Sequence, residues 1–214
     1  MPIQMQGLVG PPTGSNVSVA GNQTIRLGAG GDQIVSGLRG SYYEATRRGQ
    51  VFNAMNTTAQ AVSVGLTTTY TGLMLVNPPG NGLNLEVLSV GLGFSTVPAA
   101  QDVLALAAGT VTSNLYAGWT FTATLAANSS LAGSQATLAS TAKCITSMAT
   151  LSPAPLYFEV LGGVSYTSAV SANASVLNVD LGGRYVLLPG SYIYVAITAA
   201  LTGFFSFTWA EVPV

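Results

Sequence analysis

The sequence predicts an all-β fold: a β-sandwich or jelly-roll-like domain with an extended N-terminal arm. From about residue 60, short segments rich in Val, Leu, Thr, Tyr and Phe alternate with clusters of Gly, Pro, Asn and Ser. The first are typical of strands and the second of turns, and few apolar stripes have the period of a helix. We expect strands near residues 60–66, 70–77, 83–95, 103–109, 115–125, 135–148, 155–162, 174–180, 184–188, 191–199 and 203–210.

The 214 residues are enough for one sandwich domain with appendages. We place the sandwich at residues 56–214 and an N-terminal arm with an anchor segment at residues 1–55. Residues 1–38 contain Pro11-Pro12 and many Gly, Asn and Ser residues, which disfavour both helices and regular strands. Short alternating pairs such as Val17 with Val19 indicate that the arm becomes ordered when it lies on a partner.

The strand pair that the sequence defines best joins residues 183–188 to residues 192–197 through Pro189-Gly190-Ser191. Both faces of the second strand are bulky, so we expect both to be covered. One face carries Ile193, Val195 and Ile197, and the other carries Tyr192, Tyr194 and Ala196.

Two segments allow a second interpretation. Residues 98–108 contain good helix formers and fit one short helix as well as a strand. Residues 192–207 are uncharged and nearly long enough to span a membrane as a helix. The Pro189-Gly190 break and the β-forming residues after it favour two core strands joined by a turn, so we expect no membrane partner.

Charged residues are rare, with 6 Lys and Arg, 7 Asp and Glu, and a net charge of −1. They make up 6% of the chain, against about a quarter in an average soluble protein. Such a surface has little self-repulsion and suits close packing against protein partners. Only Arg39, Arg47 and Arg48 cluster, which is too few basic residues for the phosphate contacts of a nucleic-acid-binding protein.

The residue types for most catalytic chemistry are missing. The chain has no His, which removes the commonest general base, the commonest zinc ligand and every Ser-His or Cys-His pair. Its one cysteine, Cys144, fits a small buried hydrophobic residue. The seven carboxylates are scattered singly, so a carboxylate-pair glycosidase is a minor alternative. We therefore predict a protein that is not an enzyme and has no catalytic, cofactor or metal site.

Residues 39–55 hold the densest group of charged and aromatic side chains. Tyr and Arg are enriched at protein interfaces because they combine large contact areas with directional donors. We expect this segment to anchor the chain to a neighbouring subunit, the alternative being a solvated connector or strand edge. The candidate interface residues are Arg39, Tyr42, Tyr43, Glu44, Arg47, Arg48 and Phe52.

Several aromatic residues, Tyr42 and Tyr43 again among them, fit a platform on which sugar rings stack. Alternating aromatic residues in strands more often belong to a core or subunit interface. The residues that fit such a platform are Tyr42-Tyr43, Trp119, Trp209 and the cluster Phe204-Phe205-Ser206-Phe207.

The first residues have neither the basic start nor the apolar run of a secretory signal, so we expect synthesis and retention in a cytoplasm.

Residues 39–54, RGSYYEATRRGQVFNA, followed by residues 75–85, LVNPPGNGLNL, resemble small virion proteins of tailed bacteriophages. In those proteins an R/G-x-Y-Y-E-x-x-x-R-G-x-x-F box precedes an Asn-Pro-x-Gly-x-Gly turn. The resemblance implies a sandwich subunit that forms a homotrimer and sits on the phage head. Its implied role is that of a capsid decoration, or cement, protein.

On this resemblance the partners are copies of the chain itself and the major capsid protein. The location is the virion, assembled in the host cytoplasm. The alternative is a receptor-binding or tail-fibre head module that recognises host surface glycan, because tail and fibre proteins share such folds.

Overall fold

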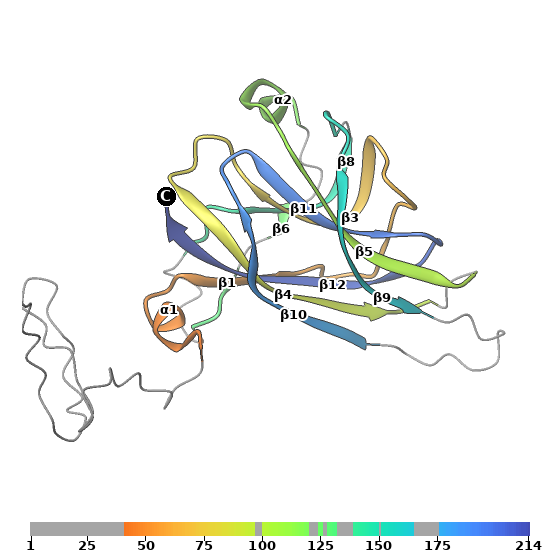
Figure 1. The fold of residues 1–214 in the computed structure, drawn as a ribbon, viewed down its shortest axis with the longest axis horizontal. Coiled ribbons are helices and arrows are strands. Elements are labelled where there is room, and N and C mark those ends of the chain that lie inside the picture. The colour runs from red at the N-terminus through yellow and green to blue at the C-terminus, as the bar shows by residue number, and fades with distance from the viewer. Residues whose placement is uncertain are drawn as a thin grey trace, which may run out of the picture. The chain divides into compact units, whose positions relative to one another are not determined.

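The computed structural model describes residues 41–96, 100–119, 124–125, 128–131, 139–149, 151–164 and 176–214. The expected N-terminal arm lies outside the described residues. The chain divides into two compact units, Met1–Tyr43 and Glu44–Val214. The second unit contains a sandwich of two antiparallel sheets (Figure 1).

Among the described residues, each sheet has six strands. The first sheet has the order β10 (Val176–Leu187), β4 (Leu83–Phe94), β12 (Thr202–Pro213), β1 (Val51–Met55) and β7 (Asn128–Ser129), and β2 (Gln60–Ala61) also pairs with β12. The second has the order β6 (Thr124–Leu125), β8 (Lys143–Ala149), β3 (Thr69–Asn77), β11 (Ser191–Ile197), β5 (Asp102–Thr110) and β9 (Leu156–Val164). Two short helices, α1 (Tyr43–Arg47) and α2 (Ser113–Ala117), complete the described elements.

Eight of these strands form a jelly roll. They have the order β1-β12-β4-β10 in one sheet and β3-β11-β5-β9 in the other, and most successive strands along the chain alternate between the two sheets. This is the double-sheet arrangement of two Greek keys. The prediction of an all-β sandwich is confirmed. The segment between β5 and β9 adds α2, β6, β7 and β8; β7 extends the first sheet beyond β1, and β8 with β6 extends the second sheet beyond β3.

The core fills the space between the sheets and continues onto the outer face of β11. All six residues from Tyr192 to Ile197 are at most 1% exposed, which confirms that both faces of this strand are covered. Over the tyrosine face, the rings of Trp119 and Tyr192 are 5.9 Å apart and those of Tyr70 and Tyr194 are 4.0 Å apart. Cys144 is fully buried, as expected.

The Pro189-Gly190 turn was predicted to join two paired strands, and this is wrong. It joins β10 of the first sheet to β11 of the second, and the two strands pair with different neighbours. The backbone of Gly190 donates to Asn77 and accepts from Val111, so the turn is attached to the ends of the second sheet. A tight turn can either reverse the chain within one sheet or lead it from one sheet to the other. The two hydrogen bonds of Gly190 favour the second arrangement.

The strand expected at residues 103–109 is β5, and residues 102–108 of the helix alternative at 98–108 belong to it, where their Ala and Leu side chains pack in the sheet. Other boundaries differ from the expected ones. Part of the strand expected at 115–125 is helix α2, because the Thr112 hydroxyl accepts a hydrogen bond from the Leu115 amide at the helix start. The two strands expected at 174–180 and 184–188 form the single strand β10, with Gly182 and Gly183 at positive φ inside it. Strand β1 belongs to the sandwich, which therefore begins before residue 56.

Residues 192–207 form strands β11 and most of β12, as predicted. Among the described residues, no helix combines the length and the apolar character that crossing a membrane requires.

Candidate interaction surface

One side of the sandwich has an open edge in both sheets. Strand β9 is the last strand of the second sheet and pairs only with β5 among the described strands, and β10 is the last strand of the first sheet and pairs only with β4. The two strands lie near each other in Figure 1 and are joined by side-chain contacts. On the opposite side, β7 and β8 extend the sheets. Unpaired backbone donors and acceptors are therefore concentrated along β9 and β10.

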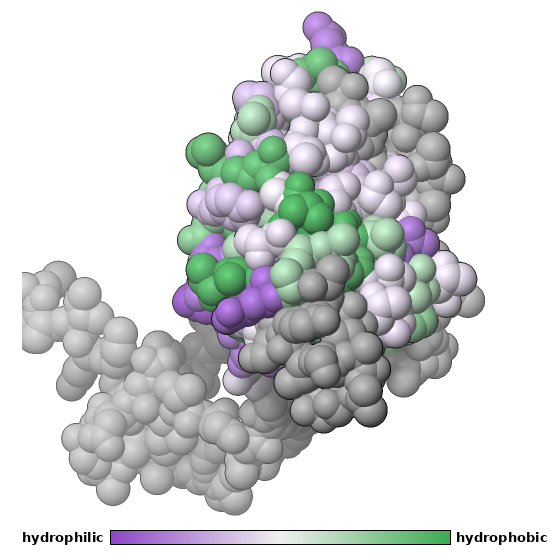
Figure 2. Space-filling view, turned by 90° about the vertical axis from the view of Figure 1, so that its right-hand side faces the viewer, coloured by the Kyte–Doolittle hydropathy of each residue, from purple (hydrophilic) through white to green (hydrophobic). Residues whose placement is uncertain are grey.

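Large apolar side chains are exposed along this open side, with exposed fractions between 50% and 68%. We call these residues the β9–β10 edge: Leu156, Tyr157, Phe158, Val160, Val186 and Leu188. Figure 2 views the molecule from the side that lies at the right in Figure 1, and shows hydrophobic side chains exposed among weakly polar ones. Single exposed apolar residues are ordinary in soluble proteins, but a contiguous group is a feature of interaction sites.

The irregular pairing of β9 brings apolar side chains to both of its faces. The register with β5 shifts twice, and the two residues without a register partner are Phe158 and Leu161. Each shift is a bulge that resets the alternation of side chains. Tyr157 and Val160 consequently lie on the same outer face as Ala105 and Ala107, their partners in β5.

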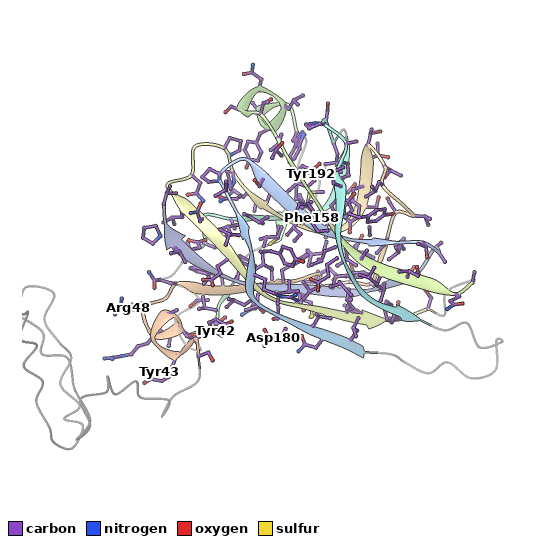
Figure 3. The ribbon with its side chains drawn as sticks, in the orientation of Figure 1. Tyr42, Tyr43, Arg48, Phe158, Asp180 and Tyr192 are labelled. Atoms are coloured by element: carbon purple, nitrogen blue, oxygen red, sulfur yellow. The ribbon has the colours of Figure 1, made fainter. Side chains whose placement is uncertain are left out.

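Phe158, labelled in Figure 3, lines two hollows. The first has a volume of about 340 Å³ over the outer face of the second sheet, and the side chains around it include Val103, Ala105, Tyr157, Val160 and Ala196. The second has a volume of about 280 Å³ and reaches strand β10. The side chains around the second hollow include Ala108, Pro153, Leu156, Tyr185 and Tyr192. Both are lined mainly by apolar groups, which suits apolar side chains of a partner.

An ionic contact joins the two open strands. The Tyr185 hydroxyl donates a hydrogen bond of 2.7 Å to Glu159 Oε2, and Arg184 Nη2 lies 3.2 Å from Glu159 Oε1. The ring of Phe158 meets that of Tyr185 edge-on at 6.1 Å. The hydrogen bond from Tyr185, with a further contribution from Arg184, lowers the pKa of the Glu159 carboxyl, and the same hydrogen bond raises the pKa of Tyr185. Strands β9 and β10 carry three charged residues in the described part of the chain, and two of them, Glu159 and Arg184, form this ion pair while Asp180 lies apart from it.

The predicted anchor residues are placed in different environments. Tyr43, at 44% exposure, and Arg47 lie on α1, and Arg48 follows it with an exposed side chain (Figure 3). Tyr42 is half-buried. Glu44 lies on α1, but its side chain is outside the described part, as is the whole of Arg39.

Phe52 requires a correction. Its ring is 3% exposed and stacks on Trp209 with 6.3 Å between centroids, so it contributes to the core and offers no surface to a partner. The reason is that residues 51–55 form a strand of the sandwich, and the register places Phe52 directly opposite Trp209.

The aromatic residues considered for a sugar platform do not form one surface. Trp119, Trp209, Phe205 and Phe207 are buried, and Phe204 alone of that group of five is exposed. Tryptophan fluorescence is therefore not a suitable probe of saccharide binding to an exposed platform.

The β9–β10 edge was missed as a site. The sequence predicts a strand at 155–162, but a run of apolar residues in a strand usually means that both faces are buried. The signal was the succession of large apolar residues from Leu156 to Leu161 with a single charge, immediately before Gly162-Gly163.

Within the described part of the chain, no three metal-ligating side chains gather into a group that could hold an ion. No family model matches the chain, and no curated protein or solved structure matches it.

Proposed function

We propose that this protein is a non-enzymatic structural subunit of a virion, and specifically a decoration protein of a tailed-phage head that acts as a homotrimer. It binds the assembled capsid lattice and copies of itself. Because it binds the assembled lattice and not its dissociated parts, it stabilises the lattice by mass action, through buried area and without chemistry.

The β9–β10 edge is the observation that carries the proposal. Apolar side chains on two open sheet edges suit a protein partner, and a surface with few charges suits close packing. The jelly roll is also a fold of viral capsid domains, although fold alone does not decide function. The specific link to a phage head comes from the resemblance of residues 39–54 and 75–85 to small virion proteins.

The exposed side chains at α1 suit the contact with the capsid. Arg48 and Tyr43 offer a cation and an aromatic ring at the surface, which are favoured groups at interface centres. Replacing Arg47 and Arg48 together by Ala should weaken capsid occupancy, and the loss should depend on salt because charged contacts are screened. Occupancy that is the same at low and high salt for the variant and the wild type would exclude this role.

The direct test removes the coding sequence from the phage genome. Particles made without the protein should release their DNA at a lower temperature than wild-type particles, and addition of the purified chain should restore the wild-type value. The chain should also be present in purified wild-type particles. Its absence from them, or deletion particles with unchanged stability, would contradict the proposal.

A receptor-binding module is the second candidate, favoured by one observation. Tyr157 is 51% exposed beside the 340 Å³ hollow, and an aromatic ring next to a hollow suits the apolar face of a sugar. Calorimetric titration with host polysaccharide fragments separates the two candidates. Binding that disappears in a Tyr157→Ala variant would favour the receptor-binding function.

A further inference from the structure

We propose that the β9–β10 edge is covered by a second copy of this chain. This inference rests on the proposed function and names the partner at its principal surface. Its basis is the combination of an open strand edge without Lys or Pro, a paired Arg184 and Glu159, and an apolar surface that the free subunit has to cover.

The two open strands have bulges but lack Lys and Pro, which commonly protect sheet edges. Natural edge strands are commonly blocked by Lys, Pro or inward charges, which prevent pairing with other chains. Strands β9 and β10 contain no Lys and no Pro. The Glu159 carboxylate is bound to Arg184 and Tyr185, and the Asp180 carboxylate accepts a hydrogen bond from the Gly182 amide. The bulges at Phe158 and Leu161 interrupt the row of backbone donors and acceptors along β9. The contact between two copies therefore consists mainly of side-chain packing, with strand pairing over short stretches.

The charge pattern selects an uncharged partner surface. Arg184 Nη2 and Glu159 Oε1 lie 3.2 Å apart and form a pair with no net charge. Phe158 and Val160, which flank Glu159 in the sequence, and Val186, which follows Tyr185, are exposed apolar residues. A strongly acidic or basic partner gains nothing there and loses the solvation of its own charges. A second copy fits this requirement because 13 charged residues among 214 leave most of its surface uncharged.

The order of assembly favours a second copy over the capsid protein. Free subunits exist before they meet a particle, and an apolar edge exposed at that stage promotes aggregation. Other copies of the chain are the one partner that is always present at that stage. Contacts between copies that persist in solution are typically more apolar than transient ones, which agrees with the composition of this edge.

The test places a charge in the edge and a matched charge elsewhere. Val160 is 67% exposed on β9, and Met55, 55% exposed on β1, is the control. Val160→Lys should lower the affinity between copies at least tenfold and move the molar mass towards the 21.7 kDa of one chain. Met55→Lys should keep the wild-type mass, and circular dichroism should show that both variants are folded. Equal masses for wild type and Val160→Lys would overturn the inference.

A second measurement uses the unaltered chain. Hydrogen exchange of the amides in residues 156–164 should slow as protein concentration rises, because association covers them. Exchange that is independent of concentration, or a wild type that stays monomeric, would overturn the inference.

The two proposals fail in different ways. A monomeric wild type that still occurs in purified particles overturns the self-docking edge and leaves the virion function standing. If Val160→Lys has a lower molar mass than the wild type but the chain is absent from purified particles, the result supports the contact through the β9–β10 edge and contradicts the virion function.

Discussion

The Tyr185 hydroxyl and the Glu159 carboxylate are 2.7 Å apart, and this hydrogen bond joins the last strand of one sheet to the last strand of the other. The sandwich is thereby held together at the side where both sheets are open. The same two residues lie within the surface that we propose as the contact between copies.

The contact between Glu159 and Tyr185 should make stability depend on pH in the acidic range. Because the folded-state pKa of Glu159 is lowered, its contribution is present above the ordinary glutamate pKa of 4.5 and is lost as pH falls through the lower folded value. The melting temperature of the wild type should therefore fall more steeply than that of Glu159→Gln between about pH 5 and about pH 3. Parallel pH profiles for the two proteins would show that the contact contributes nothing.

Asn77 should be the most sensitive polar residue of the turn at 77–82. Its buried amide donates 2.8 Å to the Leu187 carbonyl and 2.9 Å to the Leu83 carbonyl, linking the end of β3 to both neighbouring strands of the other sheet. Asn77→Ala leaves these carbonyls without that donor and should cost about 2–4 kcal/mol of unfolding free energy.

The matched control for Asn77 is Asn178→Ala, at an exposed position of β10, which should change the unfolding free energy by less than about 0.5 kcal/mol. Urea unfolding measures both variants. A similar small change for the two variants would exclude the bridging role of Asn77.

Gly190 should tolerate no side chain. Its φ is +82°, and an added Cβ would lie 3.0 Å from the Val111 carbonyl oxygen. We expect Gly190→Ala to lower the unfolding free energy by about 1–3 kcal/mol. Gly82→Ala, where no atom lies within 4 Å of the new Cβ, should be neutral within about 0.5 kcal/mol. Thermal unfolding that ranks the two variants in the opposite order would refute this account of the crossing.

Cys144 should be unreactive while the chain is folded. Burial raises its pKa to about 12, so the reactive thiolate is nearly absent at neutral pH, and the sulfur is also closed to reagents. Iodoacetamide should label the thiol only after unfolding, as mass spectrometry would record. Rapid labelling of the native protein would place Cys144 outside the core.

The sequence predicts the strands better than their partners. Alternating apolar residues locate β3, β4, β11 and β12 because the period-two pattern is local. The assignment of β10 and β11 to different sheets depends on contacts of Asn77 and Val111 with the Pro189-Gly190 turn, which are distant in the sequence. Local patterns therefore describe the elements of the jelly roll and not the crossing between its sheets.

The candidate site was only partly predictable from the sequence, because side-chain exposure depends on contacts between residues that are distant in the sequence. The exposed cation Arg48 follows from the concentration of charge at residues 39–48, whereas the burial of Phe52 follows from its pairing opposite Trp209. The exposure of Leu156 and Val160 depends on β9 being the last strand of its sheet. A strand's position in a sheet is a property of the whole chain, so apolar residues at an open edge look like core residues in the sequence.

The molar mass of the wild-type chain in solution tests the central claim most directly. Light scattering coupled to size exclusion should be run over a wide range of protein concentrations. Our account predicts a stable oligomer, and the resemblance to virion proteins predicts about three times the 21.7 kDa of one chain. A mass of one chain at every concentration would contradict assembly through the β9–β10 edge.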